Sequence, residues 1–260
     1  MNKAIKCLFL GQSGIWLNFN SLDILIDPYI FNSVCDKYGF VFDRQVQFPH
    51  VAVSLAKADY IFLTHDHLDH ADPESIGHIY NLNPKIQIFC PEKTWKILKK
   101  IRVPNKSFHV LQEKSVYLNQ SLKLNVIPAA HTKLKYNRSG NLPNVGYLFE
   151  YHKQFIYHSG DTIPHPEIIS AVTSIGKPDI AFLPCNERNY YREMMGIVGN
   201  MSVREMFQFA EDIKAKRVCP IHWDMFKFNS VFPEEIKLLH SLLKSSVNLT
   251  IPEHGVYYDI

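Results

Sequence analysis

The sequence predicts a single α/β domain built from two halves, each a β-sheet with its helices. Strand-like apolar runs alternate with helical segments throughout the 260-residue chain. No Pro/Gly/Ser-rich linker, charge block or low-complexity tract separates the halves. Apolar residues make up 46% and charged residues 20% of the chain, which is typical of a folded protein with a sizeable core.

The first third of the chain predicts a meander of strands. Apolar runs at 5–10, 15–19 and 22–26 are separated by turn residues, and the third run ends at Asp27. Residues 29–57 follow, with six aromatic residues and no clean period of either kind. A long irregular segment in a compact domain is often functional, so we interpret it as an insertion beside the functional site, with a mobile surface insertion as the alternative.

Helices and strands alternate after this segment. Asp72 and Pro73 are typical of an N-cap and a first helical position, and they predict a helix through about Tyr80. Ser202 and Glu205 form a capping-box pattern at the start of a helix over 202–215. Further helices are predicted after Pro91, over 166–175 and from Pro233, and strands over 86–90, 122–127, 147–151, 155–158, 180–183, 217–221 and near Val256.

Apolar stripes predict which faces of two helices pack inward. In the 202–215 helix these residues are Val203, Met206, Phe207, Ala210 and Ile213. In the last helix they are Ile236, Leu239, Leu242 and Leu243. Both stripes are interpreted as core packing.

Charge and cysteine content disfavour several classes of function. The net charge of +3, from 28 Lys and Arg against 25 Asp and Glu, is too small to predict nucleic-acid or membrane binding. The five cysteines include no C-x-x-C pair, which indicates free thiols in a reducing compartment. The N-terminal apolar run stops at Gly11, too short for a signal peptide, and no run approaches the ~20 residues of a membrane span. We therefore expect a cytoplasmic protein.

The stretch LTHDHLDHAD, residues 63–72, holds three histidines and three aspartates directly after a strand-like run. A helix would point side chains two residues apart in nearly opposite directions, and a strand would separate His70 from His65, His67 and Asp69. A loop that curls around an ion can present all four. Imidazole and carboxylate groups suit Zn²⁺, Mn²⁺ or Fe²⁺, so the cluster predicts a metal site.

Three residues elsewhere repeat this arrangement, because each follows the end of an apolar run. They are His131, Asp161 and His222. Together with the first cluster they give seven candidate ligands in four loops, which favours two divalent ions, Mn²⁺ or Zn²⁺. A solvated polar loop is the alternative, and the three remote partners argue against it.

These motifs resemble the metallo-β-lactamase superfamily from about residue 5 to the C-terminus. The resemblance implies a four-layer αβ/βα sandwich with one or two metals at the edge between its sheets. It also implies two ligand sets, which are His65, His67 and His131 for one ion and Asp69, His70 and His222 for the other, with Asp161 as the bridge between them.

A narrower resemblance is to the L-ascorbate-6-phosphate lactonase group, manganese-dependent enzymes that open a phosphorylated sugar lactone. It is carried by YHSGDT at 157–162, MSVREMFQFAEDIKAKRVCPIHWDMF at 201–226 and FPEEI at 232–236. Segment 186–195, NERNYYREMM, is longer than its counterpart in that group. We therefore expect a relative with an altered substrate.

The resemblance implies a metal-dependent hydrolase that opens a lactone or related ester of a small anionic substrate. Asp69 is expected to be catalytic, handling the proton of the attacking water as well as ligating an ion. A phosphodiesterase and a thioester hydrolase on the same dinuclear site are the alternatives. Oxygen-reducing di-iron members of the superfamily carry a glutamate where this chain has His67, which disfavours redox chemistry.

Segment 186–195 is expected at the sheet ends, beside the ligand loops, because it joins a predicted strand to the capped helix. Guanidinium and phenol groups suit a phosphate or carboxylate on a small substrate. The candidate substrate contacts are Arg188, Tyr190, Tyr191 and Arg192, with His165 near Asp161 and with Lys133, Lys135 and Arg138 beyond His131. Solvated surface charge is the alternative. A small anionic molecule is thus the expected partner, and self-association is left open.

Overall fold

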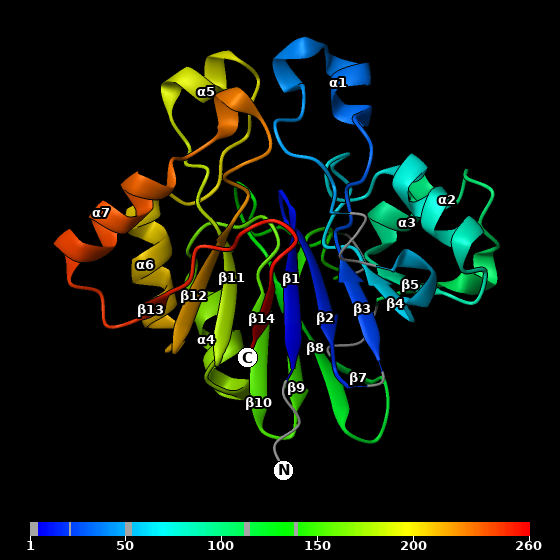
Figure 1. The fold of residues 1–260 in the computed structure, drawn as a ribbon. Coiled ribbons are helices and arrows are strands. Elements are labelled where there is room, and N and C mark those ends of the chain that lie inside the picture. Colours follow the sequence, from blue (N-terminus) through cyan, green and yellow to red (C-terminus); the bar gives the residue numbers. More distant parts are fainter. Residues whose placement is uncertain (1–4, 21, 50–53, 112–114, 138–139) are drawn as a thin grey trace.

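Two β-sheets face each other in the computed structural model, which describes residues 5–20, 22–49, 54–111, 115–137 and 140–260. Within these residues the strands form two sheets of seven, in the orders β14-β1-β2-β3-β4-β5-β6 and β13-β12-β11-β10-β9-β8-β7. Helices lie on either side of the pair of sheets (Figure 1). The predicted α/β fold, a four-layer αβ/βα sandwich, is confirmed.

The first sheet begins as the predicted meander and continues in parallel. The antiparallel part contains β1 (Lys6–Gly11), β2 (Gly14–Asn18), β3 (Asp23–Ile26) and the returning β14 (Tyr257–Asp259). The parallel part runs from β3 through β4 (Tyr60–Phe62), β5 (Gln87–Cys90) and β6 (Phe108–Val110). Because β3 and β4 are parallel neighbours, the residues that follow them meet at one edge of the sheet.

The second sheet places three more ligand loops at one edge. Its antiparallel part contains β7 (Ser115–Tyr117), β8 (Leu122–Pro128), β9 (Val145–Tyr151) and β10 (Gln154–His158). Its parallel part continues through β11 (Ile180–Pro184), β12 (Arg217–Ile221) and β13 (Asn248–Leu249). Strands β8, β10 and β12 therefore run in the same direction and end at the same edge. The two- and three-residue strands β6, β7 and β13 were not predicted.

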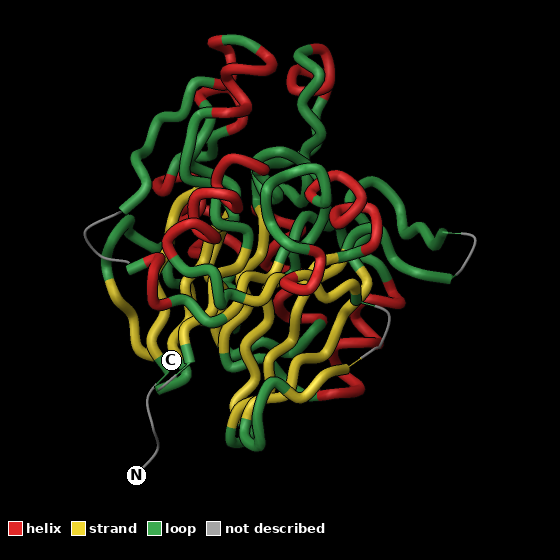
Figure 2. The backbone as a smooth tube through the Cα atoms, turned by 90° about the vertical axis from the view of Figure 1, so that its right-hand side faces the viewer, coloured by secondary structure: helices red, strands yellow, loops and turns green. Residues whose placement is uncertain are grey.

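Helices cover the outer faces, and two short ones lie beyond the strand ends. The first sheet carries α2 (Pro73–Leu82) and α3 (Glu92–Leu98), and the second carries α4 (Pro166–Ile175), α6 (Val203–Asp212) and α7 (Pro233–Leu243). The helices α1 (Ser33–Tyr38) and α5 (Tyr190–Met194) lie at the top of Figure 1, above the sheets. Figure 2 shows the strands below and the loops with their helical turns above. Single 3-10 turns lie at Phe40–Phe42, Leu55–Lys57, Asn105–Ser107 and Lys227–Asn229.

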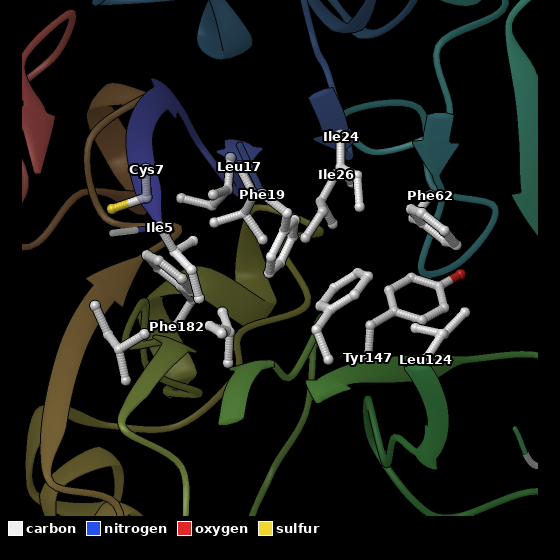
Figure 3. Packing of buried hydrophobic residues seen from close by; sticks show 14 of the residues in the cluster. Ile5, Cys7, Leu17, Phe19, Ile24, Ile26, Phe62, Leu124, Tyr147 and Phe182 are labelled. Carbon is white, nitrogen blue, oxygen red and sulfur yellow. The ribbon is translucent and has the colours of Figure 1, made fainter. Parts of the chain in front are cut away.

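Neighbouring side chains along each strand point to opposite faces of the sheet, so the core is divided into layers. Ile26 and Phe62 point toward the second sheet, where Phe62 meets Tyr147 edge-on at 5.3 Å between ring centroids (Figure 3). Ile61, the neighbour of Phe62, points outward and packs with Ile76 of α2. Both faces of the sheet are thus buried, which holds the strand ends and the loops after them in fixed positions.

The predicted helix caps and one of the two apolar stripes are confirmed. Ser202 and Glu205 form the capping box of α6, and all five stripe residues of this helix are buried. The other stripe is partly wrong, because Leu242 and Leu243 of α7 are 64% and 40% exposed. The helix lies at the sheet edge, where β13 contributes only two residues, so its last turn has little to pack against.

Segment 29–57 adjoins the predicted ligand loop; its residues 50–53 lie outside the described residues. The Arg44 guanidinium donates to the backbone oxygens of Ile30, Phe31 and Val46, which holds the segment together. Tyr29, Val34 and Phe42 of the segment pack in one cluster with Met225, Phe226 and Leu68. Because Leu68 lies between two predicted metal ligands, this segment packs against the predicted ligand loop.

Two expectations from the composition concern free cysteines and the absence of membrane spans. All five cysteines are buried free thiols, and burial raises the pKa of the Cys90 thiol to about 12, which keeps it protonated. Among the helices in the described ranges, none is both long enough and apolar enough to cross a bilayer.

Candidate metal centre

All seven predicted ligands come together at the strand ends. They form two groups, His65, His67, His131 and Asp161 in the first and Asp69, His70 and His222 in the second, and within each group the donor atoms lie within 4.8 Å of one another. They come from the loops after β4, β8, β10 and β12. The four loops predicted from the sequence therefore build one site between the two sheets.

Asp161 lies between the two groups. Its Oδ2 lies 3.6 Å from His131 Nε2 of the first group and 3.4 Å from His222 Nε2 of the second. Its Oδ1 lies 3.4 Å from His70 Nε2. One buried carboxylate thus reaches the ligands of both groups, which is the placement expected of a bridge.

Buried donor atoms without partners show that the site fits a cation. Among the described residues, His65 Nε2, His70 Nε2 and Asp161 Oδ1 are buried on the inner side of the groups and make no hydrogen bond. Leaving such a group unpaired costs about 1–3 kcal/mol. Nitrogen and carboxylate donors in this number suit Zn²⁺ or Mn²⁺. A divalent ion in each group would supply the missing partners.

Asp27, which in the sequence marks only the end of an apolar run, contacts the candidate ligands from the side away from the centre of the site. It follows β3 and lies 2.7 Å from His70 Nδ1. It also accepts hydrogen bonds from Thr64 N at 2.8 Å and Thr64 Oγ1 at 2.6 Å, and that hydroxyl lies 3.0 Å from His65 Nδ1. Contacts on the far ring nitrogen fix the tautomer and turn Nε2 toward a metal.

Buried carboxylates raise the pKa of two histidines in the centre. Burial disfavours the charged form of His222, but Asp161 and Asp69 outweigh burial and raise its pKa to about 9. The pKa of His70 is likewise raised, because Asp161, Asp69 and Asp27 outweigh burial. Burial lowers the pKa of His65. Without a metal, protons on His70 and His222 thus balance the negative charge of the neighbouring aspartates. A bound cation would balance the same charge.

We expect metal binding to release protons at neutral pH. The raised pKa of His222, about 9, means that the free protein holds a proton which an entering ion must displace. Apparent affinity for Mn²⁺ should therefore rise with pH through the neutral range. Calorimetric titrations in buffers of different ionisation enthalpy count the released protons, and no release at pH about 7 would contradict the expectation.

Unusual backbone conformations gather at this centre. Gln12, Asp27 and His222 have φ values of 57°, 45° and 60°, in the left-handed region that most side chains avoid. Such conformations cost on the order of 1–3 kcal/mol and persist where surrounding contacts enforce them. Gly160, at φ 60°, is required by space as well, since a Cβ there would lie 2.7 Å from the Val145 oxygen. That Cβ would also lie 2.9 Å from Thr64 Cβ, so the glycine lets the loop after β10 approach the loop after β4.

The arginines of segment 186–195 bind the protein itself. Arg188 donates to the Asn200 oxygen at 2.7 Å and pairs with Glu205 at 2.5 Å. Arg192 is buried and donates to backbone oxygens of Glu187, Phe228 and Ser230. The buried Arg192 guanidinium would have to leave these partners to meet an anion, whereas that of Arg188 is about one-third exposed. The structure thus gives both arginines a role in holding the loop.

The other predicted substrate contacts lie in more open positions. Tyr190 and Tyr191 on α5 are 77% and 57% exposed. His165 is the N-cap of α4 and its Nδ1 accepts from Glu167 N at 3.2 Å. Lys133 and Lys135 are exposed, and Arg138 lies outside the described residues. The two tyrosines and the two lysines are therefore exposed enough to meet a ligand.

We expect Arg192→Ala to destabilise the fold. Three backbone oxygens lose a buried charged donor, so the free energy of unfolding should fall by about 2–4 kcal/mol, seen as a lower melting temperature. Arg188→Ala is the matched control, since its guanidinium is about one-third exposed and should cost about 1 kcal/mol or less. If both variants lose the same small amount of stability, the buried hydrogen bonds of Arg192 do not stabilise the fold as proposed.

Two facing sheets with outer helices and a centre of histidines and aspartates at the strand ends define a protein of the metallo-β-lactamase fold. A family model described as the beta-lactamase superfamily domain matches residues 23–223. The chain belongs to this superfamily.

Individual relatives match over nearly the whole chain. A UPF0173 metal-dependent hydrolase of Archaeoglobus fulgidus is 24% identical over 262 residues, covering 98% of this chain and 99% of that protein. Another, of Caldivirga maquilingensis, is 27% identical over 95% of this chain and 94% of that protein. Among solved structures, an isothiocyanate hydrolase from Delia radicum gut bacteria is 18% identical with a TM-score of 0.74, covering 98% of this chain and 100% of that one. At that identity, the structural likeness bears on the fold alone.

Proposed function

We propose that this protein is a metal-dependent hydrolase that holds two divalent ions, Mn²⁺ or Zn²⁺, and opens a lactone or a related ester. The main support is the position of Asp161, whose Oδ2 lies 3.6 Å from His131 Nε2 of the first group and 3.4 Å from His222 Nε2 of the second. The UPF0173 relatives, described as metal-dependent hydrolases, support the same class of activity.

The residues of the centre have distinct roles in this proposal. Bound divalent ions supply Lewis acidity and lower the pKa of water to about 7. His65, His67 and His131 would hold one ion, Asp69, His70 and His222 the other, and Asp161 both. Asp27 keeps the His70 ring oriented. These buried side chains are held by two rigid sheets, so they need little rearrangement during the reaction.

Asp69 is the proposed catalytic residue. Its side chain is 16% exposed, whereas that of Asp161 is 3% exposed, so Asp69 is the ligand carboxylate that reaches toward the solvent side. Its pKa is lowered because the neighbouring His70 and His222 outweigh the effect of burial, and it is therefore ionised at neutral pH. An ionised carboxylate there can accept a proton from the attacking water and pass it to the leaving group.

The substrate in this proposal is a small molecule with an anionic group. Tyr190 and Tyr191 on α5 offer exposed phenol groups near the strand ends, and Lys133 and Lys135 follow the ligand His131. These groups would hold a phosphate or carboxylate by hydrogen bonds and charge. Segment 29–57 packs on Leu68 and would therefore line another side of the substrate site.

The proposal is tested by assaying the Mn²⁺- and Zn²⁺-loaded protein against a panel of substrates. The panel contains neutral and phosphorylated sugar lactones, a phosphodiester, a thioester and an isothiocyanate. We expect the highest kcat/KM on a lactone, with loss of turnover after chelation and recovery on adding metal. A clear preference for the phosphodiester or thioester would replace the lactonase proposal, and turnover that survives chelation would overturn the metal-dependent class.

A further inference from the structure

The turn between β1 and β2 reaches into the metal centre through one side chain. Gln12 is buried there, and its Nε2 donates to Asp69 Oδ2 at 2.6 Å. The same nitrogen lies 3.0 Å from His222 Nε2. An uncharged amide from the first sheet therefore contacts two ligands of the second group.

The backbone of Gln12 is held without help from its side chain. Its N–H donates to Asp224 Oδ1 at 3.0 Å, and its carbonyl oxygen accepts from His222 N at 2.6 Å. Asp224 is itself held by His254, whose Nε2 lies 2.5 Å from the other carboxylate oxygen. These contacts enforce the left-handed φ of 57° at Gln12. The turn thus has its own anchors, and the side-chain amide is left to act on the ligands.

An amide suits this position for electrostatic reasons. A lysine or arginine would add positive charge beside an entering cation, and a second carboxylate would repel Asp69. A His222 Nε2 that carries a proton or binds a metal has no free lone pair, so it cannot accept a hydrogen bond from the amide. The amide then has Asp69 as its acceptor, and a bond to one carboxylate oxygen restricts how the carboxylate turns.

We propose that Gln12 is a positioning residue of the metal centre, which orients Asp69 so that the second group, Asp69, His70 and His222, holds its ion. The inference rests on the proposed function only in requiring two ions. Partners of this kind change metal affinity by about 10- to 100-fold when removed. The first group should be unaffected, because Gln12 contacts none of its members in the hydrogen bonds described.

The test is a calorimetric titration with Mn²⁺ of Gln12→Asn and Gln12→Met. Asparagine keeps the amide and tolerates the left-handed backbone but is one methylene too short, whereas methionine has the length without the donor. We expect both variants to bind the second ion at least about tenfold more weakly, with the first ion unchanged. An electron paramagnetic resonance spectrum of the Mn²⁺ pair gives a second readout, since coupled ions should give way to a single-ion signal.

The matched control is Lys153→Asn. Lys153 is an exposed residue at φ 68° in the turn between β9 and β10, and its replacement should leave both ions bound as in the wild type. Unchanged second-ion affinity in Gln12→Met overturns the role of Gln12. Equal weakening of both ions also overturns it, because it would indicate general damage to the fold. Wild-type protein that binds one ion would instead overturn the dinuclear proposal, so the two failures are distinguishable.

Discussion

Replacing Asp161 with alanine is expected to empty the metal centre and abolish turnover. The change removes a carboxylate that lies 3.4 to 4.0 Å from histidines of both groups. The buried imidazoles that remain lose the negative charge that favours a cation beside them. We expect metal content to fall from two ions to less than one, and kcat/KM to fall by ~10³-fold or more. Elemental analysis after dialysis and steady-state kinetics measure the two effects.

The fold should survive this substitution, because the core between the sheets does not include Asp161. Circular dichroism of the metal-free variant checks this point. Asp66→Ala is the control: Asp66 lies in the same loop as the first ligands but pairs with Lys93 at 2.9 Å and belongs to neither group. Its metal content and kcat should stay close to those of the wild type. Two tightly bound ions in the Asp161 variant would refute the bridging role.

The positions of the candidate ligands could be predicted from the sequence because of where they lie along the chain. Each ligand-bearing loop directly follows an apolar strand, and strands that run in one direction end at one edge of a sheet. His131, Asp161 and His222 therefore meet the 63–72 loop, as predicted. A single such residue would have carried little information. Four loops with the same arrangement made the pattern specific.

The supporting residues could not be predicted in the same way. Asp27 contacts His70 only because β3 and β4 are parallel neighbours, and Gln12 contacts Asp69 only because the turn after β1 lies against the loop after β4. Neither relation leaves a pattern in the sequence. Arg188 shows the reverse case, since its charge indicated an anion site while its partner, Glu205, was identified only as a capping residue.

The fold prediction failed for very short strands and for residues at the end of a helix. Strands such as β1, β8 and β9, with six or seven residues, show clear apolar runs, whereas the two residues of β13 show none. Leu242 and Leu243 continue the spacing of a buried stripe but lie past the part of α7 that packs. Periodicity predicts which face of a helix is apolar. It does not predict how far the neighbouring element extends.

Asp69→Asn is expected to lower kcat by ~10²-fold or more while metal remains bound. The substitution keeps the shape of the side chain but removes the ionised carboxylate that would accept the proton of the attacking water. The first group contains no atom of Asp69, so at least one ion should stay. Kinetics at saturating Mn²⁺, with the metal content of the same samples, separate the loss of the base from the loss of an ion.

The Mn²⁺ concentration at which kcat is measured distinguishes this role from simple ligation. In the wild type the pKa of Asp69 lies below its usual range, so the carboxylate is ionised throughout the neutral range and kcat should not fall as the pH is lowered toward about 5 through this group. The amide that replaces the carboxylate in Asp69→Asn cannot accept a proton at any of these pH values, so the deficit should be constant across them. A deficit that disappears at higher Mn²⁺ concentration would instead assign Asp69 to metal binding alone, and near-normal kcat in a fully loaded variant would dismiss its catalytic role.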